Sequence, residues 1–148
     1  MKGTLGIRPA ETADRAAIAS LIDALGYAVT VEEVEARLGL IQEAGQAVLV
    51  AELDGRVVGC LSTSVMHVLH RPAPVGRISM MVVDENHRGQ GIGAQMVRET
   101  ERLLAAKGCQ LVEVTSNNRR TDAHRFWESN GYERTSSRFA KNVTAPSS

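Results

Sequence analysis

Hydrophobic positions along the chain switch between two periodicities, and the switches mark the boundaries of the predicted elements. Apolar residues three or four apart indicate amphipathic helices, whereas short apolar or alternating stretches bounded by glycine, proline or aspartate indicate strands. The predicted helices cover residues 13–25, 31–45, 90–107 and 121–130, and the predicted strands cover residues 5–9, 47–53, 56–66, 77–83, 109–116 and 132–141. The order βααβββαβαβ predicts an α/β (α+β) fold with one mixed sheet.

Local signals indicate where several of these elements begin and end. Thr12 is the expected N-cap of the first helix. Thr30 and Glu33 have the spacing of a capping box at the start of the second helix. Asp54-Gly55 predicts a tight hairpin turn between two strands. The length suits a single domain over residues 1–148, with the small, polar residues 142–148 as a frayed tail.

Composition narrows the classes of partner. Lys and Arg total 17, equal to the total of Asp and Glu, so the net charge of zero provides no field to attract nucleic acid or an anionic membrane. Aromatic residues make up 3% of the chain, too few for a base-stacking surface. Cys60 and Cys109 lie in apolar stretches without the spacing of metal ligands, which predicts buried thiols and no metal site. We therefore expect a cytoplasmic protein with no nucleic-acid and no membrane partner.

A glycine-rich segment joins an apolar strand to the longest predicted helix. The strand ends at Val82-Val83, and Arg-Gly-Gln-Gly-Ile-Gly follows at residues 88–93. A helix start presents unpaired backbone N–H groups and the positive end of the helix dipole, and glycines let an anion approach them. The spacing fits neither a dinucleotide fingerprint, because position 96 is Met96, nor a P-loop, because no Gly-Lys-Ser/Thr follows. The pattern predicts a site for another phosphate-bearing ligand.

Two motifs resemble those of the GNAT family of acyl-CoA-dependent N-acetyltransferases. The run Arg88-x-x-Gly91-x-Gly93 is similar to the family's pyrophosphate-binding loop. Asn117, followed by the run at 123–132 (Ala-His-Arg-Phe-Trp-Glu-Ser-Asn-Gly-Tyr), is similar to the family's pattern in the last helix and the strand after it. The resemblance extends over nearly the whole chain, and it implies a central sheet that splays between its fourth and fifth strands, with acetyl-CoA bound in the wedge.

The resemblance also implies a set of contacts. The residues expected to bind acetyl-CoA are Met81, Val82, Val83, Arg88, Gly89, Gln90, Gly91, Ile92, Gly93, Ala94, Asn117, Ala123 and Phe126. Tyr27, Ser79 and Trp127 are the expected residues of the substrate pocket. A backbone N–H near Val83 would stabilise the oxyanion of the transition state.

Two departures from the family pattern leave the catalytic residues unknown. Trp127 stands where the family usually carries a tyrosine that protonates the leaving thiolate, and an indole N–H is not an acid near neutral pH. The fourth strand carries a glutamate in some relatives, but residues 77–83 contain no carboxylate here. Because a thiol has a pKa of about 8.5, a thiolate can leave without a dedicated acid, and activity is still expected.

The predicted function is transfer of an acetyl group from acetyl-CoA to a primary amine of a small molecule, by direct attack in a ternary complex. The alternatives are a non-catalytic acyl-CoA sensor and an acetyltransferase of protein lysines or N-termini. A weaker similarity to aminoalkylphosphonate N-acetyltransferases, at residues 121–126 and 138–141, implies an amine with an anionic group, which Arg119, Arg120 or Arg138 would meet. Homodimers are common in the family, so a homodimer is possible.

Overall fold

The computed structural model describes residues 3–116 and 121–144. By their internal contacts these residues form two compact units, Met1–Val114 and Thr115–Ser148. The first unit holds the sheet and three helices, and the second holds one helix, α4 (Thr121–Ser129). The expectation of a single domain stays a prediction.

The sheet of the first unit is mixed and follows the order of the chain. Its strands are β1 (Leu5–Pro9), β2 (Val48–Leu53), β3 (Arg56–Met66), β4 (Val75–Val83) and β5 (Leu111–Val114). Neighbours from β1 to β4 pair antiparallel, whereas β4 and β5 pair parallel. The mixed α/β fold predicted from the sequence is therefore confirmed.

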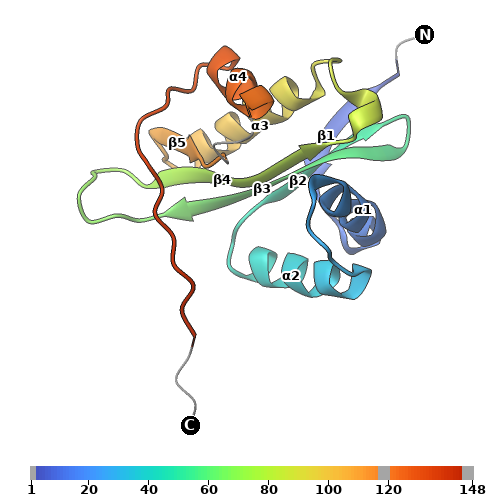
Figure 1. Ribbon diagram of the computed structural model, residues 1–148, viewed down its shortest axis with the longest axis horizontal. Helices are drawn as coiled ribbons and strands as arrows, with labels where there is room; N and C mark the ends of the chain where they lie inside the picture. The colour runs from blue at the N-terminus through green and yellow to red at the C-terminus, as the bar shows by residue number, and fades with distance from the viewer. Residues whose placement is uncertain (1–2, 117–120, 145–148) are drawn as a thin grey trace. The chain divides into compact units, whose positions relative to one another are not determined.

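Helices cover both faces of this sheet. The helices of the first unit are α1 (Arg15–Leu25), α2 (Val31–Glu43) and α3 (Ile92–Ala106), with short 3-10 turns η1 (Thr12–Asp14) and η2 (Glu85–His87). Figure 1 shows α1 and α2 on one face of the sheet and α3 on the other. No helix among those described in residues 3–116 and 121–144 is both long and apolar enough to cross a membrane.

Each face of the sheet has its own core. Under α1 and α2, buried apolar residues of the helices, the strands and the connection after β1 form one cluster: Ala10, Ile18, Ala19, Leu21, Val34, Leu38, Val48, Val50, Cys60 and Val82. On the opposite face, α3 packs against two strand glycines, Gly59 and Gly76. A Cβ at Gly59 would lie 2.8 Å from the Met96 sulfur, and a Cβ at Gly76 would lie 2.8 Å from Leu104 Cδ1. Two strand glycines thus set how closely α3 packs.

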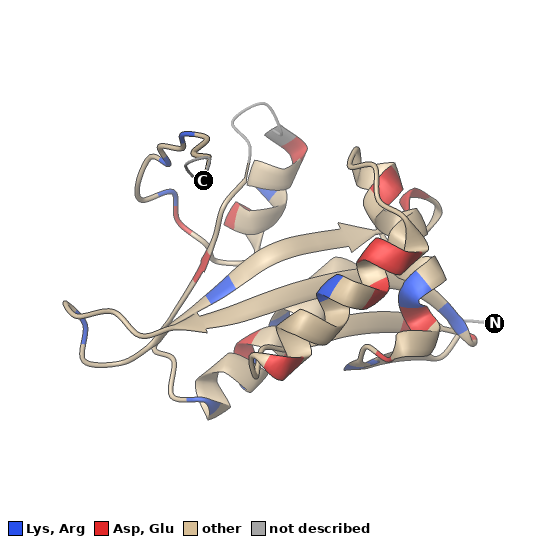
Figure 2. Ribbon diagram, turned by 90° about the horizontal axis from the view of Figure 1, so that it is seen from below, with Lys and Arg blue, Asp and Glu red and all other residues tan. Residues whose placement is uncertain are grey.

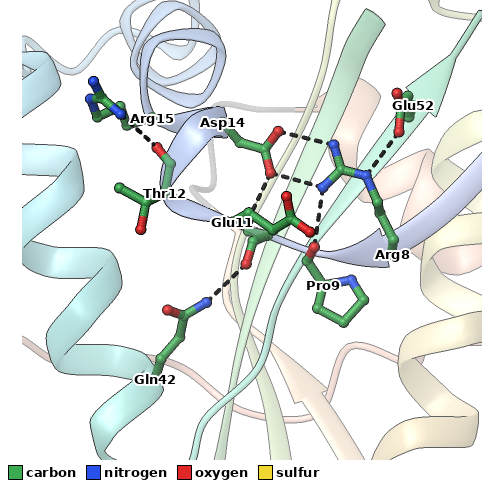
Figure 3. Close-up of polar contacts among 9 residues, drawn as sticks. Arg8, Pro9, Glu11, Thr12, Asp14, Arg15, Gln42 and Glu52 are labelled. Atoms are coloured by element: carbon green, nitrogen blue, oxygen red, sulfur yellow. Dashed lines mark hydrogen bonds and ion pairs between the residues drawn. The ribbon is translucent and has the colours of Figure 1, made fainter. Parts of the chain in front are cut away.

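An ion-pair network ties β1 to the turn before α1 (Figure 3). The Arg8 guanidinium donates to both Asp14 carboxylate oxygens at 2.8 and 3.0 Å, and its Nε donates to Glu52 at 2.8 Å. Asp14 is buried, and these hydrogen bonds from Arg8 hold the pKa of its carboxyl below the usual range. Asp14 also accepts from the Glu11 N–H at 2.8 Å. The helical start therefore lies at Glu11, and the predicted cap at Thr12 is wrong.

Several local predictions are confirmed. The Thr30 hydroxyl accepts from the Glu33 N–H at 3.0 Å and the Glu33 carboxylate accepts from the Thr30 N–H at 2.9 Å, which completes the capping box. Asp54 and Gly55 both have positive φ, as a two-residue hairpin turn requires. Both cysteines are buried, and burial raises the pKa of the Cys60 thiol to about 12.

The predicted last strand is wrong. Residues 133–144 contain no strand, and all of them are exposed. The run from 133 to 138 (Glu-Arg-Thr-Ser-Ser-Arg) is polar throughout, so it offers no apolar side chains on alternate positions to bury against a neighbouring strand. Without that burial, nothing offsets the entropy lost on ordering the segment.

Candidate functional site

The β4 strand pairs with β5 over only part of its length. The paired residues run from Val75 opposite Leu111 to Ile78 opposite Val114. Beyond Ile78, residues 79–83 have no partner on that side among the residues described in the first unit. Their main-chain groups are therefore left without a partner from β5 at this edge, because β5 ends at Val114. The splay expected between the fourth and fifth strands stays a prediction.

A β-bulge lies at the same point of β4. Thr63 of β3 faces Ile78, but Ser62 faces Met80, so Ser79 is the extra residue. Bulges of this kind bend a strand and redirect its side chains. The Ser79 hydroxyl lies 2.8 Å from the Ser62 hydroxyl and also donates to the Ser62 carbonyl at 3.2 Å. Ser79, which the sequence places in the substrate pocket, is exposed.

The glycine-rich segment forms the turn between β4 and α3. Gly89 and Gly91 both adopt left-handed φ, of +77° and +80°, and a Cβ at either would meet nothing within 4 Å. Gly91 is the N-cap of α3 and makes no side-chain cap hydrogen bond. The first hydrogen bond of the helix runs from the Gln95 N–H to the Gly91 carbonyl, at 3.1 Å. The three N–H groups before Gln95 precede that bond and are the donors that a helix start offers to an anion.

Arg88 brings a positive charge to this turn. It is exposed, and its Nε donates to the carbonyl of Val83, the last residue of β4, at 3.4 Å. The turn before it is held by Asp84, whose carboxylate accepts from the Asn86 N–H at 3.3 Å and lies 3.1 Å from the His87 ring nitrogen Nδ1. The guanidinium, the helix dipole and the unpaired N–H groups therefore lie close together along the chain, which is an arrangement suited to a phosphate group.

The other residues expected around the turn differ in what they expose. The side chains of Val82 and Ile92 are buried, so only their main chains are available to a ligand. Gln90 is exposed, while Met81, Val83, Gly93 and Ala94 are half-buried. All of these residues lie on the part of β4 that has no partner in β5, or on the turn and first helical residues after it.

In the second unit, three aromatic rings lie against one another. Phe126 and Trp127 of α4 meet edge to face with centroids 5.0 Å apart, and Trp127 meets Tyr132 in the same manner at 5.1 Å. Trp127 is buried, whereas Phe126 and Ala123 are half-buried. Gly131, with φ of +89°, ends the helix as predicted, and the Tyr132 N–H donates back to the Trp127 carbonyl at 3.0 Å. Asn117, expected in the cofactor site, lies outside the described residues.

Sequence reasoning missed a charged pair on the sheet. Arg77 of β4 lies in register with Glu113 of β5, and their side chains approach to 3.9 Å. The alternating pattern of the sequence predicted a strand that contains Glu113, but it did not show which residue Glu113 faces. That neighbour is set by the pairing of β4 with β5, which depends on the crossover through α3.

Tyr27, expected in the substrate pocket, is 65% exposed on the connection between α1 and α2. Arg119 and Arg120 lie outside the described residues, and Arg138 is exposed.

Comparison with known proteins identifies the family. The profile of the Acetyltransferase (GNAT) family matches residues 15–132. The chain belongs to this family. An aminoalkylphosphonate N-acetyltransferase from Salmonella typhimurium is 38% identical over 88 residues, which cover 60% of this chain and 57% of that protein. The match therefore spans little more than half of the length of this curated relative.

Solved structures of GNAT proteins share the fold. An aminoglycoside N-acetyltransferase in complex with CoA superposes with a TM-score of 0.87 at 19% identity, covering 98% of each chain. Glucosamine-6-phosphate N-acetyltransferase from Arabidopsis thaliana gives a TM-score of 0.81 at 24% identity, covering 95% of this chain and 99% of that one. An acetyltransferase from Trypanosoma brucei gives 0.81 at 23% identity, covering 95% and 100%. At these identities the likeness concerns the fold.

Proposed function

We propose that this protein is an N-acetyltransferase that moves the acetyl group of acetyl-CoA to a primary amine of a small molecule. The observation that carries the proposal is the turn from β4 into α3, where two glycines with left-handed φ open the start of a helix beside an exposed arginine. Membership of the GNAT family supports acyl-CoA as the ligand of this turn.

In this proposal the pyrophosphate of acetyl-CoA lies at the start of α3. The N–H groups of residues 92–94 donate to its oxygens, and the Arg88 guanidinium neutralises part of its charge. Neither Gly89 nor Gly91 has a side chain to obstruct this approach. That Asn117, Ala123 and Phe126 also contact the cofactor stays a prediction, which rests on the family pattern that they match.

The rest of the cofactor runs along the unpaired edge of β4. From Val83 back to Ser79, this edge presents main-chain donors and acceptors that an extended amide-bearing arm can use as a neighbouring strand would. The thioester is thereby carried away from the turn and toward the bulge. A main-chain N–H near Val83 or Met81 is the proposed donor to the oxyanion that forms on the thioester carbonyl.

The reaction is a direct transfer in a ternary complex. The neutral amine attacks the thioester carbon, the new C–N bond forms, the C–S bond breaks and CoA leaves as a thiolate. The nitrogen loses its proton to water, and the thiolate then takes a proton from solvent, since a thiol pKa of about 8.5 makes it a tolerable leaving group. Trp127 supplies no acid for this step.

The acceptor is proposed to be a short amine with an anionic group. The 38% identity with an aminoalkylphosphonate N-acetyltransferase over 88 residues supports this choice of acceptor. Among small amines, we therefore expect aminoalkylphosphonates to be acetylated with higher kcat/KM than polyamines or aminoglycosides.

A thiol-release assay tests this function. Acetyl-CoA is incubated with the protein and each amine of a panel that includes aminoalkylphosphonates, polyamines, aminoglycosides and amino acids. The proposal expects amine-dependent release of CoA thiol with at least one member, and mass spectrometry of the product should show a gain of one acetyl group. Acetyl-CoA binding without turnover on any amine contradicts the enzymatic part of the proposal.

A second function is favoured by one observation. Trp127 is only 8% exposed, and its ring contacts the rings of Phe126 and Tyr132. The position at which the family usually has a proton donor therefore contributes to aromatic packing here. A chain that binds acyl-CoA without acetylating an amine would tolerate this replacement. Binding of acetyl-CoA by titration calorimetry, together with no thiol release, is the result expected of such a sensor.

A further inference from the structure

Polar side chains gather on the face of the sheet that α1 and α2 cover in part. Cys60 and Val82 belong to the core under these helices, and alternation along β3 places Ser62 and Ser64 on the same face as Cys60. Register then extends this face across two more strands, because Ser64 pairs with Arg77 and Arg77 pairs with Glu113. We call this group the polar floor; it consists of Ser62, Ser64, Arg77, Ser79 and Glu113.

The polar floor is accessible, whereas two neighbouring residues of the same face are buried. Ser79 is exposed, and the side chains of Arg77 and Glu113 are 32% and 47% exposed. Cys60 and Val82, which lie on the same two strands and belong to the core under α1 and α2, are buried. The floor also lies where β4 stops pairing with β5, so it adjoins the free edge that the proposed function gives to the thioester.

Arg77 gives one end of the floor a cationic group in a defined position. Its Nη1 lies 3.9 Å from the Glu113 carboxylate, an ion-pair distance longer than a hydrogen bond. Such a partner orients the guanidinium without matching a bidentate contact in strength. A planar guanidinium at a half-exposed position is well suited to phosphonate, carboxylate or sulfonate groups, which it binds through two parallel hydrogen bonds.

The other end of the floor offers hydroxyl oxygens. Ser79 Oγ lies 2.8 Å from Ser62 Oγ and donates its own proton to the Ser62 carbonyl at 3.2 Å. With that donation in place, the Ser62 hydroxyl donates to Ser79 Oγ, and each oxygen keeps lone-pair capacity for an N–H donor. Two residues of strand separate Arg77 from Ser79, about 6.6 Å, and the anionic group and the amine of a short aminoalkyl acid can span this distance.

We propose that Arg77 selects an acceptor bearing an anionic group and that the Ser62–Ser79 hydroxyl pair receives the acceptor's amine. The inference rests on the proposed function for its reaction and adds the residues that choose the substrate. The serines act as positioning residues: they accept hydrogen bonds from the amine and keep their own protons, and the proton released on C–N bond formation passes to water.

Matched substrates and variants test the anion contact. We compare kcat/KM for 2-aminoethylphosphonate and for propylamine, which lacks the anion, in the wild-type protein, Arg77→Met and Arg77→Lys. Arg77→Met is expected to lower kcat/KM for the phosphonate by about 10- to 100-fold, the size of a charged hydrogen-bond pair, and to leave propylamine unchanged. Arg77→Lys should recover part of the loss. Arg102→Met, an exposed position on α3, is the control that should change neither value.

The serine pair has a different signature. Ser79→Ala is expected to raise KM for both amines alike, because it removes an acceptor for the N–H groups that the two substrates share, and to leave the dissociation constant of acetyl-CoA unchanged. A wild-type KM for both amines in Ser79→Ala would overturn the part assigned to the hydroxyl pair.

A binding experiment separates this inference from the proposed function. 2-Aminoethylphosphonate is titrated into CoA-saturated wild-type protein and into CoA-saturated Arg77→Met. Binding to the wild type that Arg77→Met weakens at least tenfold supports the anion site, and if no thiol release accompanies it, the proposed function alone falls. Equal binding by both proteins, or none, overturns the anion site, and turnover that does not depend on Arg77 does the same while leaving the proposed function in place.

Discussion

The Gln95 N–H donates to the Gly91 carbonyl at 3.1 Å, and this bond closes the first turn of α3 on a residue with φ of +80°. Few side chains tolerate this φ, because a left-handed conformation costs a non-glycine residue about 1–2 kcal/mol. The same geometry directs the first free N–H groups of α3 away from any protein acceptor in the helix. Glycine at position 91 therefore allows the left-handed φ that the turn requires, and this turn directs the first N–H groups of α3 toward the proposed ligand.

Replacing Gly91 with glutamate should abolish CoA binding. The new carboxylate enters the space that the phosphates require, since a Cβ at Gly91 meets no atom within 4 Å, and its charge repels them. We expect no measurable heat of CoA binding by titration calorimetry.

A control separates this effect from backbone strain. Gly45→Glu imposes the same conformational penalty, because Gly45 has φ of +77° and equally open space around its Cβ position, but it lies after α2. This variant should lose about the same stability and bind CoA as the wild type does. Unchanged CoA affinity in Gly91→Glu would contradict the assignment of the turn.

Trp127→Tyr should preserve or raise turnover. A tyrosine restores a phenolic O–H that can protonate the leaving thiolate, and its ring can keep the contacts with Phe126 and Tyr132. We expect kcat at least equal to the wild-type value, with Trp127→Phe as the control that keeps a ring without a donor. A tenfold fall in kcat for Trp127→Tyr would show that the indole itself shapes the site.

Asp14→Asn should destabilise the first unit by about 3 kcal/mol, because it leaves the charge of Arg8 without its buried partner. Glu52→Gln removes a half-exposed partner of the same guanidinium and should cost under about 1 kcal/mol. Urea denaturation of the two variants at pH 7 measures both values.

The contribution of Asp14 also depends on pH. Because the folded pKa of Asp14 lies below its unfolded value of about 3.9, its stabilisation is present in full above that pH and is lost as the pH falls through the folded pKa. The difference in unfolding free energy between wild type and Asp14→Asn should therefore shrink as the pH falls from about 3.9 through the folded pKa. A difference that stays constant over this range would contradict the account.

Gly76→Ala should weaken the packing of α3 on the sheet. A Cβ there would lie 2.8 Å from Leu104 Cδ1 and 3.2 Å from Leu104 Cβ, and Leu104 is fully buried. Overpacking of this kind costs about 1–3 kcal/mol. The cost should be smaller when Gly76→Ala is made together with Leu104→Ala, and a double-mutant cycle by urea denaturation measures the difference.

The sequence predicted those features whose causes are local. The Thr30–Glu33 capping box, the Asp54-Gly55 turn and the glycine turn before α3 each depend on residues within a few positions of one another, so residue type and spacing suffice. The burial of Thr100 on α3 was not predicted. Thr100 is fully buried, and its hydroxyl donates to the Met96 carbonyl at 2.8 Å. This hydrogen bond lets the polar group be buried, but it cannot be inferred from the residue type.

Features that depend on pairing between distant segments were not predictable in the same way. Met66 pairs with Val75, so regular pairing from there would place Ser62 opposite Ser79. In the structure a bulge makes Ser79 the extra residue, and nothing in the sequence of β4 indicates that bulge. The pair of Arg77 and Glu113 depends on how the crossover through α3 sets β5 against β4. The predicted last strand failed because the polar run at residues 133–138 offers no apolar face to bury.

Amide chemical shifts during titration with CoA test the central claim most directly. In nitrogen–proton correlation spectra of the wild-type protein, the account predicts that the amides of residues 89 and 91–94 show the largest changes at saturating CoA. Pantetheine, which lacks the pyrophosphate, should leave these amides nearly unchanged. CoA binding that shifts other amides and spares residues 91–94, or no CoA binding at all, would contradict the proposal that the start of α3 holds the pyrophosphate.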